Sequence, residues 1–332
     1  MPTRPDLVDT HGRIVRDLRI SVTDRCNLRC VYCMPAEGMP WLPREEILTY
    51  EEIERVARVC VECGVHGIRL TGGEPTVRKD LPVLVRKLRA LSPSLDLSLT
   101  TNGIQLVAMA DALRAAGLDR VNVSLDTLSR ERFQRIARRD RLADVLAGLE
   151  AARHAGFSPI KVNAVLVRGF NEDEAVPLAR WARENGFELR FIEWMPLDYS
   201  QAWDRTQLVS AAEILAQLAA ALPLGPEEDG DPSAPARTWR WADGSGRVGV
   251  VASVTRPFCG TCDRIRLTAD GQVRTCLFAH REYDVRSLLR SGAGDDALEA
   301  LLRDAVRRKL PGHLVGQREF VQPARGMSSI GG

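Results

Sequence analysis

The first two thirds of the chain alternate short runs that have a strand-like pattern with longer stretches that have a helical one. In each short run an apolar side chain occupies every second position, which is the period of a β-strand. The six runs cover residues 17–24, 67–71, 95–102, 120–126, 159–167 and 188–195. Strands that alternate with helices build parallel sheets from βα units. The pattern therefore predicts an α/β fold with six parallel strands.

The two faces of these strands differ in polarity. One face is apolar, and the other carries Arg19, Ser21, Thr23, Arg69, Thr71, Ser98, Thr100, Asn102, Asn122, Ser124, Asp126, Lys161, Asn163 and Arg190. A doubly wound sheet is apolar on both faces, and a closed eight-stranded barrel fills its interior with branched aliphatic side chains. We therefore predict a curved, partly open barrel with helices outside and a hydrated lumen for a polar substrate. An antiparallel sheet with one wet face is the alternative, and the intervening helices count against it.

One helix has clear local signals. Thr49 and Glu52 form a capping box at its start, and Ile53 and Cys60 then fall on one apolar face. Cys60 and Cys63 have the C-x-x-C spacing of some redox and metal sites. Late in an amphipathic helix, however, free cysteine packs as a small apolar side chain. We interpret this pair as part of the core.

Composition narrows the class of protein. The 332 residues are 45% hydrophobic and 27% charged with a formal net charge of +2, so no bulk positive field favours nucleic acid. The length fits one large α/β core with an appended unit. The beginning has no apolar signal region and no run of 18 apolar residues occurs, so we expect a cytoplasmic protein that does not enter a membrane. Lysine occurs at only four positions, 79, 87, 161 and 309, which makes arginine the default cation.

A cysteine triplet follows the first strand. Cys26, Cys30 and Cys33 have C-x3-C-x2-C spacing. A structural zinc site takes four ligands and cubane clusters usually take four thiolates, so three thiolates indicate a metal cluster with one vertex open to an exchangeable ligand. A disulfide would leave one cysteine unpaired in a chain without a secretory signal.

The next strands run into motifs at their carboxyl ends, where barrel chemistry belongs. Residues 71–75 read Thr-Gly-Gly-Glu-Pro, residues 100–103 read Thr-Thr-Asn-Gly and residues 124–126 read Ser-Leu-Asp. Paired glycines let a ligand approach the backbone closely. We expect a binding site at this edge.

The pattern changes after residue 195. We predict a helical segment over residues 210–221, a loop over residues 223–235 and a strand over residues 247–254. A hairpin then returns through Asp270 and Gly271. This part therefore forms a unit appended to the barrel.

A second triplet, Cys259, Cys262 and Cys276, lies in this appended unit. His280 is a candidate fourth ligand, so a Cys3His zinc knuckle is the alternative to a second open cluster. An open iron is a Lewis acid that can take a purine edge. Arginines 264 and 266 lie two apart on a strand and point to the same side.

These motifs together resemble those of the radical S-adenosylmethionine (SAM) enzymes, through the first triplet, the tyrosine before its last cysteine, and the Gly-Gly-Glu-Pro run. Further stretches are similar to the MoaA family, the GTP 3′,8-cyclases of molybdenum cofactor biosynthesis. They are residues 17–26, 99–103, 120–126 and 190–193, the second triplet, and the terminal Gly331 and Gly332. The resemblance extends over residues 14–332 apart from one variable stretch.

The resemblance implies a fold and its cofactors. The fold is a partial (β/α)6 barrel of the TIM type over residues 1–198, followed by a C-terminal extension over residues 199–332 that carries an auxiliary iron–sulfur cluster and closes the barrel. Two [4Fe–4S] clusters are implied, with SAM at the open iron of the first and GTP at that of the second. Their ligands are Cys26, Cys30 and Cys33, and Cys259, Cys262 and Cys276.

Contacts to SAM and GTP carry over by position. The resemblance places the SAM contacts on Tyr32, Gly73, Ser124 and Met195. It places the GTP contacts on Arg19, Arg69, Thr100, Lys161, Arg190, Arg264 and Arg266. Such cations and forked donors suit a triphosphate.

The resemblance also implies the reaction. A 5′-deoxyadenosyl radical from SAM takes the ribose 3′ hydrogen of GTP, C3′ attacks guanine C8, and reduction gives (8S)-3′,8-cyclo-7,8-dihydroguanosine 5′-triphosphate. The protein positions the reactants and excludes water. By composition the tail is a flexible end, whereas the resemblance implies that its two final glycines reach the active site.

The implied partners and the remaining alternatives are few. An electron donor of flavodoxin or ferredoxin type, a homodimer, and transfer of product to the cyclic pyranopterin monophosphate synthase are implied. Another two-cluster radical SAM enzyme, such as a peptide-modifying maturase, would not need so many cations around one cavity. A zinc-binding structural module is disfavoured by two incomplete triplets and a polar lumen.

Overall fold

Six parallel strands form the centre of the fold in the computed structural model, which describes residues 3–227 and 230–331. They lie side by side in chain order and are β1 (Asp17–Ser21), β2 (Gly67–Thr71), β3 (Asp96–Thr101), β4 (Arg120–Ser124), β5 (Lys161–Leu166) and β6 (Glu188–Glu193). Each of them coincides with a predicted strand. The predicted residues beyond their ends, such as 22–24 after β1, belong to loops at the carboxyl edge. The α/β fold is confirmed.

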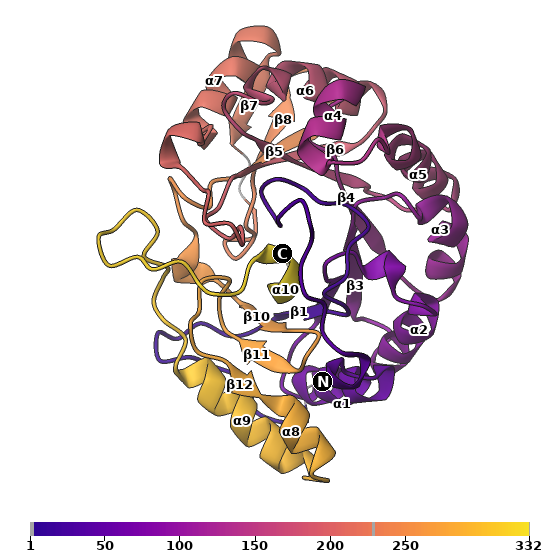
Figure 1. The fold of residues 1–332 in the computed structure, drawn as a ribbon, viewed down its shortest axis with the longest axis vertical. Helices are drawn as coiled ribbons and strands as arrows, with labels where there is room; N and C mark the ends of the chain where they lie inside the picture. The colour runs from indigo at the N-terminus through magenta and orange to yellow at the C-terminus, as the bar shows by residue number, and fades with distance from the viewer. Residues whose placement is uncertain (1–2, 228–229, 332) are drawn as a thin grey trace.

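Helices follow an arc around the outer side of these strands (Figure 1). They are α1 (Tyr50–Glu62), α2 (Leu81–Leu91), α3 (Leu106–Ala115), α4 (Arg130–Ala137), α5 (Leu142–His154) and α6 (Ala175–Glu184). The apolar strand face packs beneath them, where Ile20, Leu70 and Phe191 are at most 1% exposed. Because the polar face is left on the inner side, the arrangement is the curved, partly open barrel that the alternation predicted.

The first helix begins as its sequence predicted. Thr49 Oγ1 accepts the Glu52 amide at 3.1 Å, and the Glu52 carboxylate accepts the Thr49 amide at 2.7 Å. Cys60 and Cys63 are both fully buried in the main hydrophobic cluster. Their interpretation as core residues is confirmed.

The last third of the chain adds strands at both edges of the sheet. Next to β1 lie β10 (Arg264–Leu267), β11 (Gln272–Arg274) and β12 (Tyr283–Asp284), which include the predicted hairpin. Next to β6 lie β9 (Arg247–Val251), β8 (Arg237–Trp241) and β7 (Leu224–Glu227). Within the described residues, β7 and β12 are the ends of the sheet and do not pair. The expectation that the extension closes the barrel is therefore corrected, since strand pairing leaves the sheet open.

One predicted loop is partly a strand. Residues 224–227 lie in β7, although the run 223–235 is rich in proline, glycine and acidic residues. Proline is tolerated on an edge strand because one side of such a strand donates no ladder hydrogen bonds, and Pro226 lies on this edge. Positions 228 and 229 of the predicted loop lie outside the described residues. The helix predicted just before it is α7 (Ala211–Ala221), capped by Ser210.

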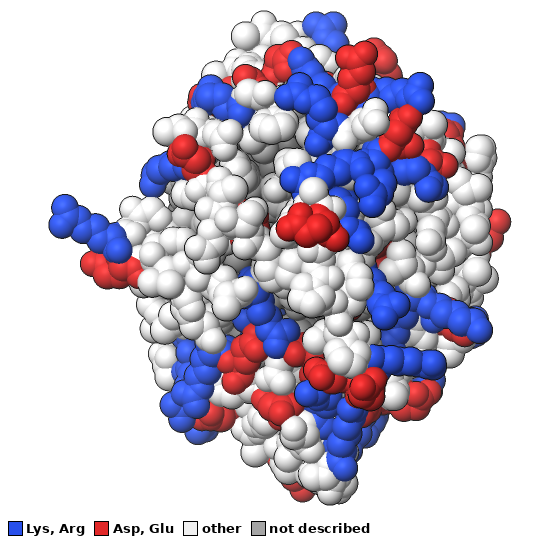
Figure 2. Space-filling model, viewed as in Figure 1, with Lys and Arg blue, Asp and Glu red and all other residues white. Residues whose placement is uncertain are grey.

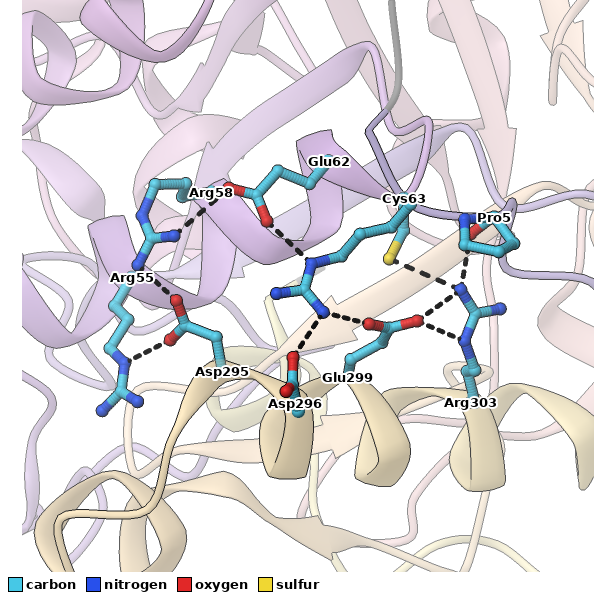
Figure 3. A network of polar contacts seen from close by, with 10 residues as sticks. Pro5, Arg55, Arg58, Glu62, Cys63, Asp295, Asp296, Glu299 and Arg303 are labelled. Atoms are coloured by element: carbon cyan, nitrogen blue, oxygen red, sulfur yellow. Dashed lines mark hydrogen bonds and ion pairs between the residues drawn. The ribbon is translucent and has the colours of Figure 1, made fainter.

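The C-terminal segment also packs on the first helix. It contains α8 (Val285–Arg290) and α9 (Asp295–Arg307), which lie together at the foot of the view in Figure 1. Figure 3 shows a polar network between α1 and α9, in which Arg55 and Arg58 each donate to Asp295 at 2.8 Å. Both parts of the chain therefore share one sheet and this network. The predicted division into two domains at residue 198 stays a prediction.

The helices of the described residues are all too short or too polar to span a membrane. None of these helices combines the length and the apolar character that crossing a bilayer requires.

Candidate active site

The first cysteine triplet lies in the loop after β1, at the carboxyl edge of the sheet. Cys26, Cys30 and Cys33 are partly exposed and border one pocket. The loop leans on the last turn of α4, where the Arg29 amide donates to the Ala137 carbonyl at 3.0 Å. The scaffold therefore holds the three sulfurs on one side of a common space.

Glycines at the end of β2 let this loop approach. A Cβ atom on Gly73 would lie 2.3 Å from the Asp24 carbonyl oxygen and 2.4 Å from that of Arg25. The Gly73 amide donates to the Thr23 carbonyl at 2.7 Å instead. The paired glycines were expected to admit a ligand, and the structure shows that they also admit the cysteine loop itself.

The triplet has the chemistry of a site for a cationic cluster. Burial raises the pKa of the Cys26 thiol to about 11, and burial together with the neighbouring sulfurs raises the pKa values of Cys30 and Cys33. Thiolates form here only when positive charge offsets burial and mutual repulsion. Three crowded thiols of this kind fit a metal cluster, which needs deprotonated sulfur ligands.

Two buried carboxylates support the first pocket and were not among the predicted site residues. Asp126 accepts the Tyr32 hydroxyl at 2.5 Å and the Val165 amide at 2.8 Å, and burial raises its pKa to about 6. Glu74 accepts the Thr101 hydroxyl at 2.6 Å. Their position at strand ends, on the polar side, was the signal that could have identified them.

The second cysteine triplet borders another pocket on the same side of the sheet. Cys259 and Cys262 belong to a turn before β10, and Cys276 follows β11. Five side chains line both pockets, which makes the two hollows neighbours along one lumen. They are Thr100, Asn163, Ile192, Met195 and Met327.

The proposed contact residues divide between these pockets. The four predicted SAM contacts, Tyr32, Gly73, Ser124 and Met195, all line the first. Six of the seven predicted GTP contacts line the second, and they are Arg19, Arg69, Thr100, Arg190, Arg264 and Arg266. The seventh, Lys161, is not among the described residues that line the pocket; it is buried, and its Nζ lies 3.9 Å from a Glu188 carboxylate oxygen.

Cations outnumber carboxylates around the second pocket. The six cations are Arg19, Arg69, Lys161, Arg190, Arg264 and Arg266, and the carboxylates that pair with them are Asp17, Glu188 and Asp263. Burial lowers the pKa of Arg69 to about 9, with Arg19 adding repulsion, and lowers the pKa of Lys161 to about 8, with Arg190 adding repulsion. The site is therefore short of negative charge, which an anionic ligand would supply.

Arg264 also has a buried donor atom that lacks an acceptor in the described part of the chain. Its Nη2 is buried and finds no hydrogen-bond partner among the residues that the structure describes, while the guanidinium lies 4.8 Å from the centre of the Phe258 ring. Burial raises the pKa of the Cys262 thiol, but Arg264 and Lys309 more than offset this and lower it to about 7. A buried donor without a partner is costly, so the geometry fits an acceptor in the lumen.

The chain's tail enters the lumen. Helix α10 (Met327–Ile330) carries Ile330, which is fully buried, and Arg266 Nη1 donates to the Gly331 carbonyl. Figure 1 shows α10 near the middle of the open barrel. The tail therefore packs inside rather than forming a free end, and Gly332 lies outside the described residues.

The rival zinc ligand lies elsewhere. His280 is exposed and bonds to the Val321 carbonyl at 3.1 Å. His313 lines the second pocket instead, but its Nδ1 accepts the Val315 amide and its Nε2 faces the Ser253 carbonyl at 2.9 Å. Among the residues that the structure describes, no group of three or more His, Cys, Asp or Glu is arranged to hold a single metal ion.

Comparisons with known families agree with this architecture. A model described as the radical SAM superfamily matches residues 20–182, and one described as Molybdenum Cofactor Synthesis C matches residues 187–315. The GTP 3′,8-cyclases of Mycobacterium sp. (strain KMS) and Streptomyces coelicolor are each 54% identical to this chain. Those matches cover 100% and 98% of this chain and 95% and 96% of the relatives. GTP 3′,8-cyclase 2 of Mycobacterium tuberculosis (strain CDC 1551 / Oshkosh) is 50% identical over 100% of this chain and 94% of its own.

Solved structures share the fold at low identity. Native anSMEcpe with bound AdoMet has a TM-score of 0.60 at 16% identity, and the match covers 93% of both chains. SuiB of Streptococcus suis has a TM-score of 0.58 at 15% identity, with 95% of this chain and 77% of that one covered. At such identities the likeness concerns the fold alone.

Proposed function

The chain belongs to the GTP 3′,8-cyclases, radical SAM enzymes of molybdenum cofactor biosynthesis, and from this premise we propose how its lumen divides the work. Membership makes it an enzyme that uses a [4Fe–4S] cluster and SAM and acts on GTP. We propose that Cys26, Cys30 and Cys33 hold that cluster. The second triplet then holds another, beside the GTP site.

Each pocket has its own task. When bound, the clusters and SAM supply the radical chemistry and an open iron. The chain's residues orient the two substrates and keep water out. SAM lies against Tyr32, Gly73, Ser124 and Met195, and Asp126 fixes the Tyr32 hydroxyl at the end of β4.

The buried excess of positive charge carries the GTP assignment. Among the described residues, six cations meet three carboxylates at or beside the second pocket, and Arg264 Nη2 has no hydrogen-bond partner. A triphosphate supplies several negative charges and many acceptors, so it completes this site. The GTP contacts are Arg19, Arg69, Thr100, Lys161, Arg190, Arg264 and Arg266. Full-length identity to GTP 3′,8-cyclases favours this reading over a peptide-modifying enzyme.

Anaerobic reconstitution tests the two clusters. We expect about eight irons per chain. Cys30→Ala should abolish SAM cleavage, whereas Cys262→Ala should retain much of it and lose the conversion of GTP to (8S)-3′,8-cyclo-7,8-dihydroguanosine 5′-triphosphate. Equal loss of both activities in both variants would refute the division into two sites.

We further propose that an acidic electron donor, of flavodoxin or ferredoxin type, docks over the first cysteine loop. Arg29 Nη1 donates to the Cys26 carbonyl at 2.7 Å, and Arg138 Nη1 donates to the Met34 carbonyl at 2.8 Å. Arg135 and Arg139 are exposed beside them. In the described part of the chain, no salt bridge joins these four arginines to a carboxylate. Figure 2 shows basic side chains gathered just above the centre of this face, where the loop approaches α4.

Charge reversal tests this docking surface. Arg135→Glu with Arg139→Glu should slow turnover driven by an acidic protein donor at least tenfold and leave turnover with dithionite unchanged. Arg86→Glu on the outer helix α2 is the matched control, since Arg86 is also exposed. Equal slowing with both reductants would contradict a docking role.

Three assignments rest on the family alone. They are a homodimer, transfer of product to the cyclic pyranopterin monophosphate synthase, and a functional division at residue 198. Sedimentation, pull-down with that synthase and limited proteolysis test them in turn.

A further inference from the structure

A buried lysine touches the second triplet. Lys309 follows α9 and is 4% exposed. Its Nζ lies 2.7 Å from the Cys262 carbonyl oxygen, 2.9 Å from the Arg264 carbonyl oxygen and 3.5 Å from the Cys262 sulfur. An ammonium group has three protons, so these three acceptors satisfy it completely.

The contact distinguishes the two triplets. At the first, the sulfur hydrogen bond seen in the described chain comes from a backbone amide, Leu28 to Cys26 at 3.4 Å. At the second, Cys276 accepts such an amide from Phe278, and Cys262 receives the lysine as well. A cationic donor at a ligating thiolate withdraws charge from sulfur, which favours the reduced cluster.

Arg13 offers an internal comparison. Its guanidinium donates to the carbonyls of Cys259, Leu310 and Pro311 at 2.7, 2.6 and 3.0 Å and pairs with buried Asp9. It therefore holds the same cysteine turn as Lys309, but in the described structure it donates to no sulfur. A purely structural cation and one that acts on the cluster can thus be compared in one molecule.

We propose that Lys309 is a positioning residue of the second cluster, which donates to the Cys262 sulfur and raises that cluster's reduction potential. The inference rests on the proposed second cluster. It assigns a role to one of only four lysines in a chain that otherwise uses arginine. Lysine presents a compact charge to a sulfur and two carbonyls, where the planar fork of arginine would fit poorly.

Redox titration tests the proposal. Each cluster is measured by electron paramagnetic resonance in full-length protein whose other triplet is replaced by alanines. Lys309→Met should shift the one-electron equilibrium of the second cluster at least tenfold towards the oxidised form, about 59 mV, and leave the first unchanged. Lys309→Gln, which keeps a neutral donor, should give a smaller shift. Lys79→Met, at an exposed lysine, should give none.

The controls separate the outcomes. Arg13→Gln should lower thermal stability and iron retention without shifting the potential. An unchanged potential in Lys309→Met, the same shift in Arg13→Gln, or loss of the second cluster from both Lys309 variants would overturn the inference in favour of a structural role. Iron for only one cluster in the unaltered protein would instead refute the proposed second cluster, and Lys309 with it.

Discussion

Individual cations of the lumen are buried beyond what their carboxylate partners offset. Lys161 shows this well, because Arg190 and Arg120 repel it and its ion-pair partner among the described residues, Glu188, is shared with Arg190. A buried like-charged neighbour favours the neutral lysine, and a bound triphosphate reverses that preference. If Lys161 contacts GTP as proposed, its charge is therefore linked to GTP binding.

This linkage predicts a pH dependence of GTP affinity. The pKa of Lys161 is about 8 in the protein without ligand, so binding GTP above pH 8 requires uptake of a proton. Affinity should be level below pH 8 and fall as the pH rises through 8. Lys161→Arg should keep the charge and remove this part of the dependence, while ionisation of guanine affects both proteins alike. Calorimetry in buffers of different ionisation enthalpy measures the proton uptake directly.

A flat profile for the unaltered protein between pH 7 and 9 would contradict the assignment of Lys161 to the GTP site. The same decline in Lys161→Arg would place the titrating group elsewhere.

At this scale the sequence was informative for residues that follow the strand period. Arg19, Arg69 and Arg190 lie on alternate positions of buried strands, so their direction into the lumen could be predicted. The contacts of Lys309 with Cys262 and of Asp126 with Tyr32 could not be predicted, because they join residues 47 and 94 apart in the chain. Such contacts depend on how elements pack, which no local pattern contains.

Among the elements, the short C-terminal tail contacts β1, β2 and Arg266 through a single residue, Gly331. Gly331 has φ +69°, and a Cβ atom there would lie 2.4 Å from Thr71 Oγ1 and 3.2 Å from Ser21 Cβ. Its carbonyl accepts from Arg266. Only glycine lets the chain turn at this point between two strands and Arg266, a proposed GTP contact.

Gly331→Ala should therefore displace the tail and slow cyclisation on the order of 100-fold, since a small misplacement of a reacting site can cost that much. Cluster content should stay intact. Gly316→Ala is the matched control, because Gly316 also has positive φ (+88°) but faces the flexible end of Arg205. Removing Gly331 together with Gly332 should act like the substitution, and unchanged turnover in either protein would refute a role for the tail.

The hydrophobic pattern predicted some helices and strands and missed others. The central strands and α1 were predicted because their buried faces have a strict period. The strands β7 and β8 were not: β7 is an edge strand that contains Pro226, and β8, which pairs with it, has Trp241 as its one buried residue, so neither shows a strict apolar period. That β10 pairs with β1, and β9 with β6, is a fact of tertiary packing between residues far apart in sequence.

For the whole molecule, the polar network between α1 and α9 fixes the helix that leads to the second cysteine triplet. Glu299 accepts from Arg4 and from Arg303, and Arg303 lies 3.9 Å from the buried Cys63 sulfur (Figure 3). The helix that this network fixes leads directly to Lys309. Weakening the network should therefore also weaken the packing of the cysteine turn to which Lys309 donates.

Glu299→Gln tests this coupling. Hydrogen bonds from Arg4 and Arg303 lower the pKa of Glu299, so its stabilisation is present above pH 4.5 and is lost as the pH falls through the lowered value. At pH 7 the substitution should lower the free energy of unfolding by about 1 kcal/mol, and 1 M NaCl should shrink the difference. Denaturant titration measures both, and Glu184→Gln, at an exposed position of α6, is the control.

The coupling predicts an order of cluster loss as well. In Glu299→Gln under a chelator, iron should leave the proposed second cluster faster than in the unaltered protein. The first cluster should keep its rate, because in the described structure its cysteine loop packs against the end of α4 and not against α9. Equal acceleration at both sites would mean that the substitution only destabilises the fold. Acceleration at the second site alone would show that the helix packed on α1 transmits its position to the cysteine turn through the segment that follows α9, which Lys309 and Arg13 join to that turn.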